Sequence, residues 1–247
     1  MKKYIILTLL ITTVSFAQKT TLYCIGDSTM ANKKDPEKNP EHGWAQVLQP
    51  LFKDNIVVVN KAVNGRSTKS FIAEKRWDSI YQKLKKGDYV FIEFGHNDEK
   101  IEDPARYTNP HTAYRYNLIK FVKESREKGA IPVLLTSISR RNFNEKGVLV
   151  PTHGDYPLET RLVAQEHKVP FIDLEYHTEL LEQSYGPDKS KELHLHFKAG
   201  DNPYYDKDKA DDTHLSLLGA TKIAEIVINE IKQSEEPLLK NLKNGIK

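Results

Sequence analysis

The sequence predicts an α/β protein in which a five-stranded parallel sheet is covered by helices on both faces. Two observations carry this prediction. Short apolar runs rich in β-branched and aromatic residues recur along the chain, and stretches with a helical spacing of apolar residues lie between them. Strands that alternate with helices in this way are typical of a parallel sheet buried on both faces. A chain of 247 residues is long enough for one well-buried core and short for two, so we expect a single domain.

Each element follows from its own stretch of sequence. The predicted strands are the apolar runs at 21–25, 56–60, 89–94, 131–136 and 171–173. The predicted helices have apolar residues at intervals of three and four, and they cover 77–84, 114–125, 174–184 and 218–232. Residues 185–210 show no clear period and are expected to form a long loop that is functional or mobile. The polar residues 235–247 are expected to form a frayed tail.

Residues 1–17 have the pattern of a secretory signal peptide. Lys2 and Lys3 form a basic start, an apolar run follows from 4 to 16, and Ala17 is a small residue at the cleavage position. The apolar run is too short to span a membrane. We therefore expect a secreted or periplasmic chain that begins at Gln18. Removing the two lysines changes 37 basic and 34 acidic residues to 35 and 34, and this balance indicates neither a nucleic acid nor a membrane partner.

Cys24 is the single cysteine, which excludes an intrachain disulfide and any cysteine-rich metal site. It fits a buried strand position, where free cysteine is common. The alternative is a lipid-modified cysteine after a lipoprotein signal. Polar residues at 18–21 and the bulky Tyr23 stand where that signal has apolar and small residues, so the strand interpretation is favoured.

Three turns that contain glycine follow the first three predicted strands. The first places Ser28 in the segment Gly-Asp-Ser-Thr-Met, the second contains Gly65, and the third contains Asn97 between His96 and Asp98. In open parallel sheets ligands bind beyond the carboxyl ends of the strands, so these turns are expected to meet at one edge. Each turn alone also fits an ordinary turn or helix cap, because Gly, Asn, Asp and Ser favour such conformations.

Asp211 and His214 precede the last predicted helix, and their spacing of three can bring them side by side on one turn. A serine hydroxyl becomes a good nucleophile when a histidine removes its proton, and a carboxylate on the other ring nitrogen orients that histidine. Ser28, His214 and Asp211 suit these three roles. The N–H groups of Ser28 and Gly65 and the side-chain amide of Asn97 could then stabilise the oxyanion.

These four blocks, in this order, resemble the SGNH hydrolase superfamily, also called GDSL-type esterases, whose motifs supply Ser, Gly, Asn and a closing Asp-x-x-His. The Gly-Asp-Ser-Thr-Met segment, the turn at 65–67 and the block at 211–214 are most similar to its rhamnogalacturonan acetylesterase branch, carbohydrate esterase family 12. The resemblance covers residues 20–232. It implies a three-layer α/β/α, flavodoxin-like sandwich that removes acetyl groups from pectic polysaccharide without a cofactor. One departure is Asp212, where this branch has Asn, and its carboxylate would add negative charge near the base.

Several residues near the predicted site are candidates for binding substrate or metal. Arg66 is placed to meet a galacturonate carboxylate, because a guanidinium binds that group in bidentate fashion. Tyr204 and Tyr205 fit either stacking on a sugar ring or packing of the long loop. His194 and His196 alternate like strand residues and could ligate a metal. No other ligand pair has matching spacing, so we expect neither a metal nor a cofactor.

We therefore expect a monomeric serine esterase domain at 18–234 that acts on acetylated pectic polysaccharide or oligosaccharide through an acetyl-enzyme. The absence of a Gly-x-Ser-x-Gly elbow and of nucleotide-binding glycine patterns argues against an α/β-hydrolase fold and a nucleotide-binding domain. Two alternatives stay open. A lipid or thioester hydrolase of the same superfamily would need an apolar groove for the acyl chain. A non-catalytic carbohydrate-binding protein would not need Ser28 and His214 together.

Overall fold

All five predicted strands form one parallel sheet. The computed structural model of the protein describes residues 19–247, so the predicted signal peptide lies outside the described residues. The strands are β1 (Thr20–Gly26), β3 (Ile56–Asn60), β4 (Tyr89–Glu93), β5 (Ile131–Leu135) and β6 (Phe171–Ile172). Their order in the sheet is β3-β1-β4-β5-β6. β1 lies between β3 and β4, and its Cys24 lies opposite Asn60 of β3 and Phe91 of β4.

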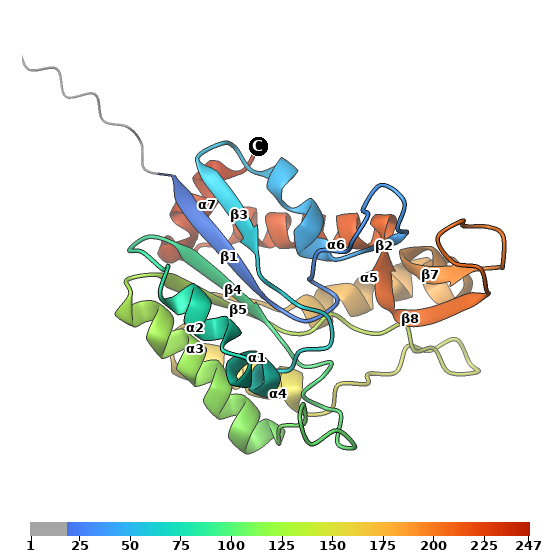
Figure 1. Ribbon diagram of the computed structural model, residues 1–247, viewed down its shortest axis with the longest axis horizontal. Coiled ribbons are helices and arrows are strands. Elements are labelled where there is room, and N and C mark those ends of the chain that lie inside the picture. The colour runs from blue at the N-terminus through green and yellow to red at the C-terminus, as the bar shows by residue number, and fades with distance from the viewer. Residues whose placement is uncertain (1–18) are drawn as a thin grey trace, which may run out of the picture.

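Helices cover both faces of this sheet and complete a three-layer α/β/α sandwich (Figure 1). One face carries α1 (Thr68–Ala73), α2 (Arg76–Tyr81), α3 (Arg115–Glu127) and α4 (Tyr156–Glu166). The other face carries α5 (Leu174–Lys189), α6 (Leu217–Gln233) and α7 (Lys240–Gly245). Short 3-10 helices lie at Trp44–Val47, Gln49–Leu51, Ser190–Leu193 and Pro237–Leu239, and a π-helical turn at Pro110–Tyr114 precedes α3.

The alternation of side chains along β1 divides the core into two parts. Leu22 and Cys24 point to the layer of α6, whereas Tyr23 and Ile25 point to the layer of α2 and α3. Cys24 is fully buried, as its strand position predicts. Because both faces of the strand are covered, the run from 22 to 25 is continuously apolar apart from the Tyr23 hydroxyl.

A second, antiparallel sheet was not predicted. It contains β2 (Glu41–His42), β7 (His194–Phe197) and β8 (Lys209–Ser216) in the order β2-β8-β7. Figure 1 shows this small sheet beyond the carboxyl ends of the parallel strands. The prediction of one loop over 185–210 is therefore wrong, because α5 extends to Lys189 and β7 pairs with β8.

The prediction of a frayed tail after Ser234 is also wrong. Leu239, Leu242 and Ile246 are buried against the sandwich. The Tyr89 hydroxyl donates to the carbonyl of Leu238 at 2.7 Å. Leu239 lies in the 3-10 turn before α7, Leu242 in α7 itself, and Ile246 after it in a bridge with Phe52, so the whole segment is packed against the core. Among the described residues, no helix is both long enough and apolar enough to cross a membrane.

Candidate active site

Ser28 stands in a tight turn directly after β1, at the carboxyl edge of the sheet. The turn is held from within, since the N–H of Thr29 donates to Asp27 Oδ1 at 3.0 Å. Gly26 lets β1 approach β4 closely, because a Cβ there would lie 2.5 Å from the carbonyl oxygen of Glu93. Ser28 itself is 8% exposed. The turn thus presents one serine in a nearly closed environment.

The structure brings together the three residues predicted to form a triad. His214 Nε2 lies 3.0 Å from Ser28 Oγ, and His214 Nδ1 lies 2.9 Å from Asp211 Oδ2. Burial would raise the pKa of Asp211, but hydrogen bonds from His214 and Thr213 outweigh it and hold this pKa well below its usual range. The ionised carboxylate can only accept, so Nδ1 carries the proton and Nε2 is free to accept from the Ser28 hydroxyl. This arrangement can remove the proton of a serine nucleophile.

Asp211 and His214 lie in a β-bulge of β8, so the predicted helical turn is wrong. Leu195 of β7 pairs with Asp211 while the adjacent His194 pairs with Leu215, which leaves residues 212–214 outside the ladder. Asp211 Oδ1 accepts the N–H groups of Thr213 and His214, both at 3.0 Å. One carboxylate therefore shapes the bulge with one oxygen and orients the imidazole with the other.

Asp212 does not direct its charge at the base, contrary to the expectation from the sequence. Its Oδ1 lies 2.8 Å from Arg141 Nη1 and 2.7 Å from His196 Nε2. The N–H of Arg141 also donates to the carbonyl of Asp212 at 2.9 Å. Asp212 thus anchors the bulge to a neighbouring loop through two basic groups.

His194 and His196, which were considered as metal ligands, make hydrogen bonds and ion pairs within the protein. His194 is buried, with Nε2 2.6 Å from Glu182 Oε1 and Nδ1 3.2 Å from the carbonyl of His214. His196 contacts Asp212. Both histidines therefore support the bulge that carries the base.

Gly65 and Asn97 lie in adjoining turns, as predicted. Gly65 has a φ of +76°, a conformation that favours glycine. The N–H of Val63 donates to the carbonyl of Gly26 at 3.0 Å, which ties the Gly65 turn to the end of β1. The Asn97 amide donates to the carbonyl of Arg66 at 3.3 Å, and its Oδ1 accepts from Arg106 Nη1 at 3.2 Å. These two contacts fix which end of the amide presents N–H groups.

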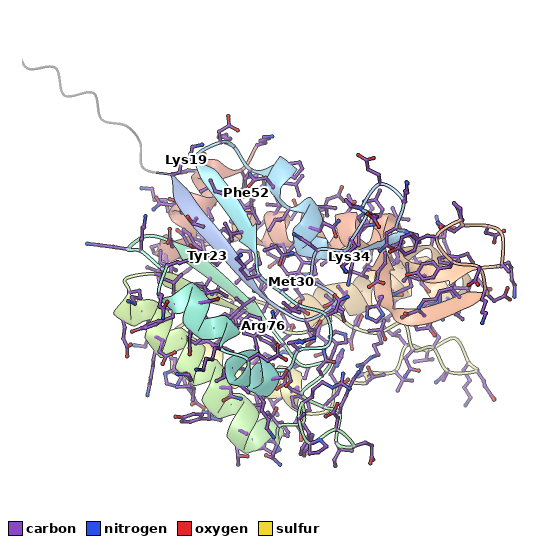
Figure 2. All side chains as sticks on the ribbon, viewed as in Figure 1. Lys19, Tyr23, Met30, Lys34, Phe52 and Arg76 are labelled. Atoms are coloured by element: carbon purple, nitrogen blue, oxygen red, sulfur yellow. The ribbon has the colours of Figure 1, made fainter. Side chains whose placement is uncertain are left out.

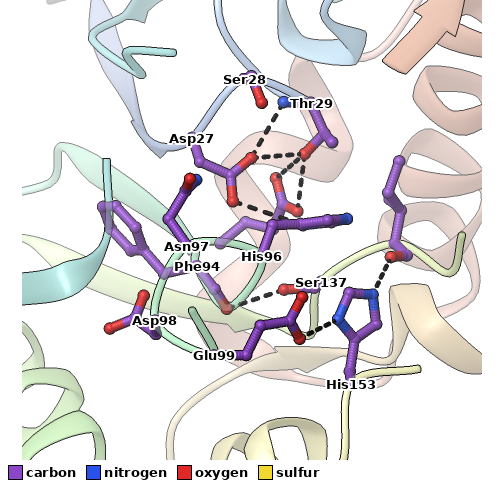
Figure 3. A network of polar contacts seen from close by, with 12 residues as sticks. Asp27, Ser28, Thr29, Phe94, His96, Asn97, Asp98, Glu99, Ser137 and His153 are labelled. Carbon is purple, nitrogen blue, oxygen red and sulfur yellow. Dashed lines mark hydrogen bonds and ion pairs between the residues drawn. The ribbon is translucent and has the colours of Figure 1, made fainter. Parts of the chain in front are cut away.

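Beneath Ser28 lies a buried polar cluster of Asp27, Thr29, Glu93 and His96 (Figure 3). The Thr29 hydroxyl has one proton but faces two carboxyl groups, Asp27 Oδ1 at 3.0 Å and Glu93 Oε1 at 3.1 Å. Burial and the charge of Asp27 raise the pKa of Glu93 well above its usual range, so Glu93 supplies the second proton. Burial would also raise the pKa of Asp27, but His96 and Thr29 hold it at about 2. Asp27 is therefore the ionised member.

This cluster has the spacing of a metal site. Potential ligand atoms of Asp27, Glu93 and His96 lie within 4.8 Å of one another. Burial lowers the pKa of His96 to about 4, so its ring is neutral at pH 7 and one of its nitrogens could bind a cation. Glu93 is protonated, so the cluster carries less negative charge than three free ligands would, and its attraction for a cation is weaker.

Asp98, the residue after Asn97, holds the start of α1. Its carboxyl group accepts the N–H and hydroxyl of Thr68 and the hydroxyl of Thr108. Burial raises the pKa of Asp98 to about 7, although these hydrogen bonds lower it. Asp98 thus connects the turn that contains Asn97 to the helix that follows Gly65.

A cleft of about 530 Å³ lies beside the nucleophile turn and has Arg66, Tyr204 and Tyr205 on its wall. Arg66 is half-buried, with its Nε 3.1 Å from Glu74 Oε1 and its Nη1 2.9 Å from the carbonyl of Asn64. The sequence predicts that this guanidinium binds a substrate carboxylate; in the structure it binds the carboxylate of Glu74. The loop that carries Lys34 runs from the end of β1 toward the small sheet (Figure 2) and borders the same cleft.

Both interpretations of the two tyrosines find support in the structure. The ring of Tyr205 lies 5.4 Å from that of Phe197 and 5.2 Å from that of Tyr204, so Tyr205 packs the loop. Tyr204 is 39% exposed on the cleft wall. An exposed aromatic ring at this position is available to stack on a sugar.

Sequence reasoning missed Glu93 and Lys33. Glu93 ends β4 in a run that is otherwise apolar, and this one charged residue in a buried strand was a usable signal. Lys33 is buried beside Ser28, but nothing in the sequence distinguishes it from the exposed Lys34.

The sandwich and the Ser-His-Asp arrangement at its carboxyl edge define a class of protein: the chain is a carboxylic ester hydrolase with the SGNH hydrolase fold. Residues 24–222 match the GDSL-like Lipase/Acylhydrolase family, and the chain belongs to that family.

Named relatives and solved structures agree with this assignment. The chain is 39% identical over 221 residues to rhamnogalacturonan acetylesterase RhgT of Bacillus subtilis (strain 168), which covers 90% of this chain and 93% of the relative. The solved structure of protein YxiM from Bacillus subtilis superposes with a TM-score of 0.72 at 23% identity, covering 87% of this chain and 57% of that chain. Axe2, an acetylxylan esterase from Geobacillus stearothermophilus, gives a TM-score of 0.61 at 20% identity, covering 88% and 96%. The two structural likenesses concern the fold.

Proposed function

We propose that this protein removes O-acetyl groups from a pectic polysaccharide, as a rhamnogalacturonan acetylesterase, with Ser28 as the nucleophile. The observation that carries the proposal is the continuous contact from Ser28 Oγ through the His214 ring to Asp211, with links of 3.0 and 2.9 Å. The relative at 39% identity is named a rhamnogalacturonan acetylesterase, which supports both the acetyl group and the pectic substrate.

The mechanism has two halves that use the same residues. Ser28 Oγ attacks the acetyl carbonyl carbon while its proton passes to His214 Nε2. The oxyanion accepts from the N–H groups of Ser28 and Gly65 and from the Asn97 amide. When the bond to the sugar oxygen breaks, His214 returns the proton to that oxygen and the acetyl-enzyme remains. Water then attacks the acetyl carbon, again with His214 as the base, and acetate and the free Ser28 hydroxyl are released.

The cleft supports a polar substrate rather than a long acyl chain. Its wall is formed largely by lysine, asparagine, glutamate and arginine side chains from the nucleophile loop and the Gly65 turn. At about 530 Å³ it falls within the usual range for small-molecule sites, roughly 300–1,000 Å³. Arg66 is proposed to exchange part of its contact with Glu74 for a galacturonate carboxylate, and Tyr204 to stack on a neighbouring sugar.

The decisive experiment measures acetate released from acetylated rhamnogalacturonan and from acetylated xylan, with Ser28→Ala as the matched inactive variant. We expect release from the pectic substrate that Ser28→Ala abolishes, with slower release from xylan. A panel of nitrophenyl esters addresses the lipid or thioester alternative. Faster turnover of long acyl chains than of acetate contradicts the proposal.

The non-catalytic alternative is tested with a fluorophosphonate probe, which labels an activated serine. We expect labelling of the wild-type protein and none of Ser28→Ala. Equal labelling of the two proteins, or of neither, favours a carbohydrate-binding protein without turnover.

Export is a separate part of the proposal, supported by the basic start and apolar run of residues 1–17. N-terminal sequencing of the protein isolated from its natural host is expected to begin at Gln18. A chain that retains residue 1 contradicts it.

A further inference from the structure

Lys33 is a buried lysine beside the nucleophile, and its ammonium group contacts three oxygen atoms of the protein. Nζ lies 2.5 Å from the carbonyl oxygen of Ser28, 2.9 Å from Asn64 Oδ1 and 2.7 Å from Glu41 Oε1. Its side chain is 3% exposed. Two of its three donors make hydrogen bonds within the protein and its charge is paired with Glu41, so the protein itself occupies the ammonium group although Lys33 borders the cleft.

Two of the three acceptors belong to segments that carry the proposed chemistry, and the third lies in a strand that pairs with the strand of the base. Ser28 is the nucleophile, and Asn64 directly precedes Gly65, whose N–H is the proposed oxyanion donor. Glu41 lies in β2, where it pairs with Ser216 at the end of β8, the strand that carries Asp211 and His214. These segments are distant in sequence, and one ammonium group joins them.

The contact with Ser28 also limits the nucleophile turn directly. The peptide between Ser28 and Thr29 is held at both ends: Lys33 binds its carbonyl, and Asp27 Oδ1 accepts its N–H at 3.0 Å. Holding this peptide plane limits rotation about the Cα–C bond of Ser28, and with it the position of the Cβ that carries Oγ. The N–H of Lys33 itself donates to Gln46 Oε1 at 2.8 Å, so the lysine is anchored at both of its ends.

We propose that Lys33 is a positioning residue that sets the nucleophile, the oxyanion turn and the strand of the base at their reactive separation. The proposal rests on the ester hydrolase mechanism above, and it is independent of which acetylated sugar is the substrate. Small displacements of reacting groups cost large factors in rate, about 10²-fold for a shift of roughly 1 Å. A side chain that ties three reacting segments is therefore expected to act on the rate of reaction at Ser28 rather than on substrate affinity.

The test replaces Lys33 with methionine, which has a similar shape and no charge. We expect Lys33→Met to lower the second-order rate of fluorophosphonate labelling roughly 10- to 100-fold. Turnover of nitrophenyl acetate should fall in kcat by a similar factor, with KM changed by less than about threefold. The matched control is Lys38→Met, which removes an exposed lysine from the same loop and is expected to label at the wild-type rate.

The outcomes separate this inference from the proposed function. Equal labelling of wild type and Ser28→Ala ends the esterase mechanism itself. If wild type labels, Ser28→Ala does not, and folded Lys33→Met labels at the wild-type rate or changes only KM, then the positioning role is wrong. If Lys33→Met does not fold by circular dichroism, Glu41→Ala decides. This variant keeps the contacts of Lys33 with Ser28 and Asn64 but removes its ion pair with β2. A several-fold slower rate of fluorophosphonate labelling supports the inference, and an unchanged rate refutes it.

Discussion

Asp211→Asn is the substitution that most directly tests the geometry of the site. Asp211 Oδ1 already receives two backbone N–H groups, so the amide oxygen must take that position and the NH₂ group must face His214 Nδ1. A donor at Nδ1 forces the ring proton onto Nε2, where it points at Ser28 Oγ and blocks proton removal. Holding the histidine of such a triad in the wrong tautomer lowers kcat by about 10⁴-fold. Since each factor of ten is about 1.4 kcal/mol, the barrier rises by about 5–6 kcal/mol.

The neighbouring Asp212 provides the matched control, because Asp212→Asn removes the same charge one residue away. Its carboxylate faces Arg141 and His196 instead of the catalytic ring. We expect a change of less than about tenfold in kcat for nitrophenyl acetate, because lost surface charge pairs are worth about 0–1 kcal/mol. Equal losses in the two variants, or a loss below about tenfold for Asp211→Asn, would refute the assignment of the ring proton to Nδ1.

Three further predictions follow from other parts of the structure. Asn97→Ala is expected to slow turnover of nitrophenyl acetate by about 10²-fold or more, the usual loss of one oxyanion donor, and an unchanged rate removes Asn97 from the mechanism. Leu242→Ala is expected to lower the free energy of unfolding in urea by about 2–5 kcal/mol, because Leu242 is fully buried in α7; a change below about 0.5 kcal/mol would contradict that packing. Burial and Asp27 raise the pKa of Glu93, so the folded state loses stability as pH rises above the unfolded value near 4.3. Urea titrations from pH 5 to pH 9 should therefore show Glu93→Gln gaining stability relative to wild type, and a difference that is constant with pH is the contrary result.

The main sheet could be predicted from sequence because its strands are buried on both faces. The run Ile56–Asn60 was predicted with its observed bounds, and the other four strands differ by one residue at an end or at both ends. The small sheet has no such signal. β8 is polar and mostly half-buried, and its pairing with β7 uses backbone groups that any sequence provides. β7 and the start of β8 therefore fell within the predicted loop at 185–210, and β2 fell in a stretch where no strand was predicted.

The identity of the site residues could be predicted, but their local geometry could not. The order of the Ser28, Gly65, Asn97 and His214 blocks is a property of the sequence, and contacts between neighbouring blocks bring all four together in the structure. A spacing of three between Asp211 and His214 fits a helical turn and a bulge equally well. The choice depends on register with β7, a partner about 16 residues earlier that the sequence gives no means to align.

The position of the base depends on a close contact that links the two sheets. A Cβ at Gly219 would lie 2.0 Å from the carbonyl oxygen of Leu193, so only glycine lets the first turn of α6 rest against the segment that enters β7. Ser216 strengthens the same junction, since its hydroxyl donates to the carbonyl of Glu192 at 2.6 Å and accepts the N–H of Gly219 at 3.1 Å. α6 is packed into the main core, and Ser216 caps its first turn. Because His214 stands two residues before Ser216, this junction fixes the position of His214 relative to the core. Glycine is unfavourable inside a helix, and its presence here is explained by the need to hold a small, polar sheet at a fixed distance from the nucleophile.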